Sequence, residues 1–366
     1  MMALTLAFEE EKGTVGDWQT RFEQVKRSIL ETMEQHAEQP LLSRRHALTL
    51  LARLPVALLG LTIEGSSIPL FAEELLPLCA TSIPACWELY YDGCIAEVQK
   101  TLPVYHAKLA ALAAQPSQYQ RQAVNLASQA YQLSSQILGG QEDFGAALAH
   151  CQQALAYARR ADDANLQVAA LIFKADVYFS KRYPFYSPQT YQAYTETLPL
   201  LKHASPLLQG RLYASLAESY AYQEQEQEAL RYMGLAQTIY PAEPKADPAF
   251  AYTGHSHFSL YVYGEGRTYL RLGQPAKAQQ ALERVDALLP KTGGVRQMIL
   301  AVRQAEVAVA ASDLERSCHY LQIAVKSAQQ PGSNLHRSHA LEIYQAMPPT
   351  WHHEKPVKEL AELLHE

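Results

Sequence analysis

The stretch Val262–Gly273, which reads VYGEGRTYLRLG, shares a pattern with Tyr213–Tyr220, which reads YASLAESY. In each stretch a small residue, Gly266 or Ala217, lies three positions before a tyrosine. A second small residue follows nine positions after that tyrosine, and a proline follows twelve positions later. Small residues at a crossing let two helix axes approach closely, and a tyrosine beside them fills the remaining gap. The pattern therefore predicts two antiparallel helices joined by a short turn.

Weaker copies of this pattern occupy residues 129–160, 169–202 and 299–330. The second small position of the five copies is held by Ala147, Thr190, Ala229, Ala278 and Ser317. Successive copies are 43, 39, 49 and 39 residues apart, so we expect extra residues in loops such as 183–188 and 242–247. Five copies in one register predict a stacked array of helix pairs rather than an unrelated helical bundle.

The repeat resembles the tetratricopeptide repeat (TPR), a helix-turn-helix unit of about 34 residues. The resemblance implies an all-α fold, an α-solenoid or right-handed superhelix of antiparallel TPR-like helix pairs. Because the spacing here exceeds that of the family, the array is divergent. Abundant Ala, Gln and Leu favour helix, and no stretch alternates with the period of two that is typical of strands.

Changes of pattern and helix-breaking residues divide the chain into three regions. We assign residues 1–65 to an N-terminal helical segment, 66–350 to an array of about six helix pairs, and 351–366 to a C-terminal capping helix. The N-terminal segment is expected to hold two helices, at 16–39 and 43–59, with no recognised DNA-binding motif, followed by a turn at 64–67. A less regular pair is expected at 68–114, and an amphipathic helix at 355–365 gives the array the polar-backed end that solenoids need.

Candidate catalytic groups are few, so we expect a protein that is not an enzyme and that uses no cofactor and no metal. The histidine pairs at 255/257 and 352/353 lack the spacing of three or four that metal ligands on one helix face need. The pair at 336/339 has a spacing of three but lacks a carboxylate or cysteine in helical register, and we interpret it as a surface pair. No two of the five cysteines have the two-residue spacing of a zinc or redox motif. The convergent carboxylates of a helical-solenoid enzyme cannot be assembled from the sequence, and that class is kept as an alternative.

Charge and hydropathy bear on location and partners. The net charge of −6 gives no basic footprint, so we do not expect nucleic-acid binding through this chain alone. The longest apolar run, residues 46–63, contains Arg53 and Pro55 and is too interrupted for a membrane span. A twin-arginine-like sequence at Arg44 and Arg45 lies far from the start, and its targeting role stays open. We expect a cytoplasmic protein.

In TPR proteins the first helix of each pair lines a concave groove, and its outward residues contact a peptide or protein partner. The resemblance carries these positions over to Gln129, Gln132, Gln136, Asp176, Phe179, Arg211, Glu218, Tyr222, Tyr263, Arg267, Arg271 and Glu306. Amides, aromatic rings and arginines suit an extended peptide with acidic groups or a free carboxylate. Arg267 and Arg271 lie one turn apart and should project together, either toward the peptide or into ion pairs with Glu265 or Glu218.

Residues 43–60, SRRHALTLLARLPVALLG, together with the repeats, are also similar to the TPR sensory region of bacterial helix-turn-helix transcriptional regulators. That similarity covers roughly residues 16–366 and lacks the DNA-binding half of such proteins. It implies a scaffold or sensor in bacterial transcriptional regulation or signalling. A regulator that binds DNA through Arg44 and Arg45 is the alternative, and a homodimer is left open.

Overall fold

The structure, a computed structural model, describes residues 49, 62–63, 66–67, 72–182, 187–286, 288, 294–328 and 334–365. The chain divides into two compact units, Met1–Leu51 and Ala52–Glu366. Apart from Thr49, which is helical, the described residues all belong to the second unit. The helices expected at 16–39 and 43–59 therefore lie almost wholly outside the described part.

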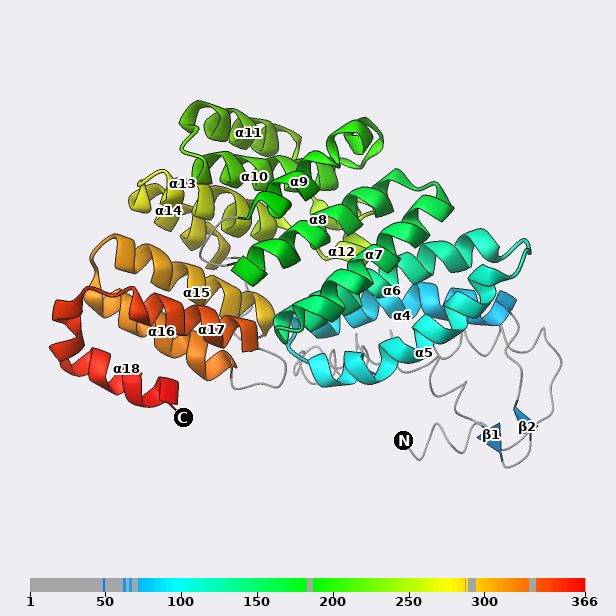
Figure 1. Cartoon of the computed structure of the whole chain (residues 1–366), viewed down its shortest axis with the longest axis horizontal. Coiled ribbons are helices and arrows are strands. Elements are labelled where there is room, and N and C mark those ends of the chain that lie inside the picture. The colour runs from blue at the N-terminus through cyan, green and yellow to red at the C-terminus, as the bar shows by residue number, and fades with distance from the viewer. Residues whose placement is uncertain are drawn as a thin grey trace. The chain divides into compact units, whose positions relative to one another are not determined.

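The second unit is built from successive antiparallel helix pairs, as the repeats predict (Figure 1). The first three pairs are α4 (Ala72–Tyr91) with α5 (Ile95–Ala114), α6 (Gln120–Gly140) with α7 (Phe144–Ala161), and α8 (Ala164–Arg182) with α9 (Pro188–Thr195). The later ones are α10 (Pro206–Tyr222) with α11 (Glu226–Ile239), η3 (Ser259–Gly266) and α13 (Arg267–Arg271) with α14 (Pro275–Asp286), and α15 (Val295–Ala310) with α16 (Leu314–Ala328). The remaining helices are η1 (Leu198–His203), η2 (Pro244–Ala246), α12 (Phe250–Thr253), α17 (Asn334–Gln345), η4 (Pro349–His353) and α18 (Lys355–His365).

Small residues lie at the helix crossings, as predicted. The five residues at the second small position (Ala147, Thr190, Ala229, Ala278 and Ser317) are each 0% exposed. A Cβ atom added to Gly264 would lie 2.9 Å from Ala214 of α10, and one added to Gly266 would lie 2.9 Å from Leu282 of α14. These distances are shorter than van der Waals contact, so the two glycines allow the close packing of η3 on both neighbours. The all-α fold of stacked helix pairs is confirmed.

The first helix of the decisive repeat differs from a regular α-helix. Residues Ser259–Gly266 form a π-helix, which continues directly into the α-helical turn that begins at Arg267. π-Helical turns are rare and often mark functional sites, because the extra residue per turn re-aims the side chains that follow. The sequence pattern, which reports only spacing, predicted an ordinary helix here.

Contacts between distant helices close the inner side of the array, where the first helices of the pairs meet. Helix α4 packs against α12 and α15, and α17 packs against α6. The Tyr91 hydroxyl donates a hydrogen bond to the Thr253 carbonyl at 3.0 Å, and Arg296 donates one to the Gly254 carbonyl at 2.8 Å. The Arg296 guanidinium also lies 3.7 Å from the centre of the Tyr91 ring. We call this set the Tyr91 junction; it joins α4, α12 and α15.

The chain end and the short hairpin complete the described part. Helix α18 spans the residues predicted for a terminal helix, and its Val357 and Leu360 are buried against α16. The expected turn at 64–67 is partly wrong, because Ser66–Ser67 forms a strand that pairs antiparallel with Thr62–Ile63. No described helix is long and apolar enough to cross a membrane.

Candidate binding site on the inner side of the array

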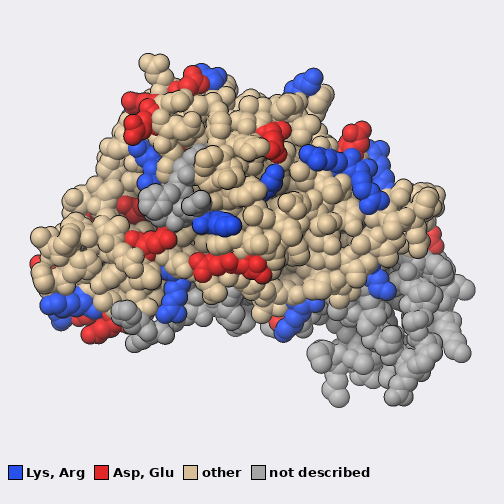
Figure 2. Space-filling model, in the orientation of Figure 1, with Lys and Arg blue, Asp and Glu red and all other residues tan. Residues whose placement is uncertain are grey.

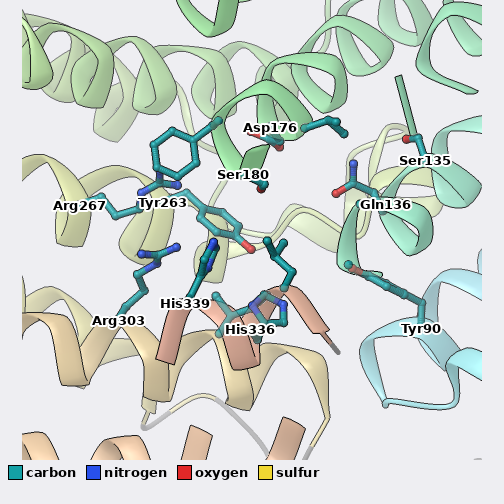
Figure 3. Close-up of a pocket in the computed structure, with 16 residues that line it drawn as sticks. Tyr90, Ser135, Gln136, Asp176, Ser180, Tyr263, Arg267, Arg303, His336 and His339 are labelled. Atoms are coloured by element: carbon teal, nitrogen blue, oxygen red, sulfur yellow. The ribbon is translucent and has the colours of Figure 1, made fainter. Parts of the chain in front are cut away.

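A pocket of about 90 Å³ lies where six segments converge on the inner side. Its wall is built by α4, α6, α8, the η3–α13 segment, α15 and α17 (Figure 3). In Figure 3, Arg267 and Arg303 lie on one side of Tyr263, and Gln136 and Tyr90 lie on the other. The pocket thus brings together residues from both ends of the array.

Most of the partner-binding residues predicted from the TPR resemblance gather at this pocket. Its wall includes Gln136, Asp176, Phe179, Tyr263 and Arg267. Five more contact the wall residues or the network behind them, namely Arg211, Glu218, Tyr222, Arg271 and Glu306.

The remaining two predicted partner-binding residues, Gln129 and Gln132, lie on α6, apart from the pocket wall. Gln132 is fully buried and donates a hydrogen bond to the Leu166 carbonyl at 3.2 Å, and Gln129 donates one to Asn125 at 2.6 Å.

The predicted arginines are held by carboxylates in ion pairs. Arg211 donates two hydrogen bonds to Asp176, at 2.9 and 3.0 Å. Arg267 pairs with Glu218, whereas Glu265 pairs with Arg284. Of the two alternatives for Arg267, the structure contains the ion pair with Glu218, and this arginine is only 8% exposed.

A single carboxylate joins two further arginines. Glu306 accepts hydrogen bonds from Arg271 at 2.7 Å and from Arg303 at 2.9 Å. Arg271 was expected to project beside Arg267, but it reaches this different carboxylate. We call the four arginines and three carboxylates the inner ion-pair cluster: Arg211, Arg267, Arg271, Arg303, Asp176, Glu218 and Glu306.

Aromatic faces fix the orientation of the guanidinium groups. Arg267 stacks 3.8 Å from the centre of the Phe179 ring, and Arg271 lies 4.6 Å from that of Tyr222. Cation–π contacts of this kind are stronger where water is excluded, and the flat guanidinium matches the ring plane. The aromatic residues predicted as partner contacts therefore also position the arginines.

The charges of the cluster change the titration of its members. Burial opposes ionisation of Glu306, but Arg303 and Arg271 outweigh it and hold the pKa of this carboxyl below its usual value. For Glu218, burial is the stronger effect and raises the pKa despite the neighbouring Arg267. Burial, with a contribution from Arg303, lowers the pKa of His336 to about 3 and that of His339 well below its usual value. Both imidazoles are therefore neutral at pH 7.

The interpretation of His336 and His339 as a surface pair is wrong, and His255 is buried as well. His339 is 4% exposed and His255 is 3% exposed, while His336 is partly buried in the pocket wall. His255 packs beside the Phe173 ring, with 5.5 Å between ring centres. A neutral imidazole packs like any aromatic ring, so the residue type alone does not say whether a histidine is buried or exposed.

The prediction from sequence did not include several residues of the pocket wall, above all Arg303 and Tyr90. Arg303 lies one helical turn before Glu306, which was predicted, so spacing within α15 could have found it. Tyr90 lies in the irregular first pair, where no register was assigned. Among the described residues, no group of three histidines, cysteines or carboxylates could hold a metal ion.

Comparison with known proteins yields a distant structural likeness. The chain matches no protein family and no curated protein. Among solved structures, it matches the crystal structure of yeast Tom70 with a TM-score of 0.40 and 14% sequence identity. The match covers 90% of this chain and 64% of the Tom70 chain, so the chain spans less than two thirds of that protein. The fold and site described above do not depend on this likeness.

Proposed function

We propose that this chain is a non-enzymatic scaffold that binds a protein or peptide partner on the inner side of its TPR-like array. One observation carries the proposal: residues from consecutive repeats converge on one pocket, and their arginines are held on aromatic faces. Arginine and aromatic residues dominate the energetics of protein interfaces. In this proposal residues 66–350 form the binding array and 351–366 form its cap.

The state of the carboxylates favours binding over catalysis. A general acid or base must exchange protons with a substrate, so it needs an accessible group with a suitable pKa. Here an arginine forms an ion pair with each of the three carboxylates, Asp176, Glu218 and Glu306. The nearby His339 is neutral and buried.

The size of the pocket refines the expected mode of binding. About 90 Å³ accommodates one side chain or a chain end, whereas an extended peptide needs a groove along several repeats. The Tyr91 junction occupies part of the inner side that such a groove would use. We therefore propose that the partner inserts one acidic group into the pocket and makes its other contacts around the rim.

We further propose that the protein is cytoplasmic and acts in bacterial transcriptional regulation. This role is supported by the sequence similarity over residues 43–60, nearly all of which lie outside the described residues. On the face shown in Figure 2, basic and acidic side chains of the described residues lie in small scattered groups. A scaffold acting through a protein partner should give no salt-dependent shift of duplex DNA, and a shift at low salt would favour the DNA-binding alternative.

Isothermal titration with a library of acidic peptides tests the proposal. Arg267→Gln should weaken binding about tenfold or more, because charge-assisted hydrogen bonds to a carboxylate are among the strong ones. Arg316→Gln is the matched control, since this arginine makes a partly exposed pair with Glu283 at 3.4 Å. A library without any binder, or equal affinity of the wild type and the Arg267 variant, would overturn the proposal.

A further inference from the structure

The wall of the pocket carries more positive than negative charge. Arg267 and Arg303 contribute two guanidinium groups, and Asp176 contributes the single carboxylate. That carboxylate is already engaged by both hydrogen bonds from Arg211. His336 and His339, which also line the pocket, are neutral at pH 7. Behind the wall, Glu218 pairs with Arg267 and Glu306 pairs with Arg303, so the inner ion-pair cluster has one arginine more than it has carboxylates.

The uncharged part of the wall is rich in hydrogen-bond donors. The side-chain amide nitrogen of Gln136 is buried and has no hydrogen-bond partner. Burial raises the pKa of Tyr90 and of Tyr263, so both hydroxyls keep their protons at pH 7. Ser180 adds a further hydroxyl. A buried donor without a partner is costly, and an anion accepts hydrogen bonds from several directions at once.

The volume limits the size of what can enter. A dry cavity of about 150 Å³ is known to hold one benzene molecule. The pocket here, at about 90 Å³, is smaller. It has room for an inorganic oxyanion or a carboxylate of a few carbon atoms.

We propose that this pocket is a binding site for one small free anion, a short carboxylate or a tetrahedral oxyanion, between Arg267 and Arg303. The amide of Gln136 donates to the anion from the opposite wall. The proposal goes beyond the scaffold function, because occupancy requires no partner protein. The bound anion connects α6, α13 and α15, so its presence stabilises the closed arrangement of the inner side.

A carboxylate outside the pocket wall also opposes the anion. Glu342 of α17 lies close enough for the charge of Arg303 to act on its pKa, but it does not line the pocket. Its negative charge repels an entering anion. Removal of this charge should therefore strengthen anion binding, whereas loss of an arginine should weaken it.

Thermal unfolding of the full chain tests the inference. Sodium acetate and sodium phosphate are titrated separately against sodium chloride at constant ionic strength. We expect Tm to rise with the logarithm of the concentration of at least one of the two anions. Arg267→Gln should raise the apparent Kd at least tenfold, and Glu342→Gln should lower it severalfold. Arg231→Gln, on the exposed face of α11, is the control and should leave the response unchanged.

Isothermal titration separates loss of binding from loss of folding. If Arg267→Gln unfolds the chain, Gln136→Ala takes its place and should raise the Kd severalfold. The absence of a response to both anions in the wild type would overturn the inference. So would an unchanged response in a folded Arg267→Gln or Gln136→Ala variant. A chain that binds acidic peptides but neither free anion refutes this inference and leaves the scaffold function standing.

Discussion

The ion pairs on the inner and outer sides of the array share their chemistry but differ in burial. On the outer side, Arg231 and Glu228 of α11 form a pair with side chains 54% and 43% exposed. On the inner side, Arg267 and Glu218 form a pair with side chains 10% and 5% exposed. Exposed pairs contribute about 0–1 kcal/mol, whereas burying a pair costs desolvation that the attraction repays only in part. Burial of the inner ion pairs is therefore weak evidence that they stabilise the fold, and the proposed binding function gives them a role that the outer pair does not have.

The largest effect should come from breaking an inner pair. Glu218→Ala leaves Arg267 buried without its carboxylate, and we expect a loss of about 3–5 kcal/mol in the free energy of unfolding. Urea denaturation followed by circular dichroism measures this. A loss as small as that of a surface substitution would mean that water reaches the cluster, and the contrast between the two sides would disappear.

Each buried histidine should give the next largest effect, through pH. Because their folded-state pKa values lie below the unfolded value of 6.5, the unfolded state takes up protons first as the pH falls. The contribution of these neutral histidines to the free energy of unfolding is fully present above pH 6.5. It is lost as the pH falls below 6.5, down to about pH 3 for His336. Each such group removes about 1.4 kcal/mol per pH unit.

Denaturation at several pH values between 7 and 5 measures how steeply the free energy of unfolding falls with pH. His339→Leu should make this slope shallower, whereas His203→Gln, a change at an exposed position of η1, should leave it unchanged. Equal slopes in the wild type and the His339 variant would contradict the burial of this side chain.

A smaller, local effect is expected at the Tyr91 junction. Arg296→Met removes the contact with the Tyr91 ring and the hydrogen bond to Gly254, together about 1–3 kcal/mol. Hydrogen exchange should become roughly tenfold faster or more at the ends of α4 and α12 and at the start of α15 together. The α10–α11 pair serves as the internal reference. Faster exchange confined to α15 would show that the junction is not a cooperative unit.

The smallest effect belongs to the outer pair. Glu228→Ala should change the free energy of unfolding by less than about 0.5 kcal/mol, since the pair is exposed and lies within one helix. Urea denaturation beside the Glu218 variant measures the two values under one condition. A loss of several kcal/mol here would remove the distinction between inner and outer pairs.

The sequence predicted the features that depend on local side-chain volume. The small residues at helix crossings, such as Ala229 and Ala278, occupy the buried positions that their spacing indicates. Most of the predicted partner-binding residues also lie on or behind one pocket, because repeats in register place equivalent positions on one side of the array.

The features that depend on distant contacts could not be predicted in this way. The packing of α4 against α12 and α15 is such a feature, since the hydrogen bond between Tyr91 and Thr253 spans 162 residues, far more than any repeat period. Whether an arginine faces a ligand or a carboxylate depends on the next repeat, as the pairing of Arg271 with Glu306 demonstrates. The burial of His255 and His339 likewise depends on neighbours from other helices.

The most direct test of the account replaces one inner pair by apolar residues. In the double variant Arg267→Met with Glu218→Leu, both charges are removed together, so no buried charge is left uncompensated. Titration with the best acidic peptide, alongside urea denaturation, is the measurement. We predict a folded chain with stability within about 1 kcal/mol of the wild type or above it, and no detectable peptide binding. Peptide binding as tight as that of the wild type, in a folded double variant, would contradict the account.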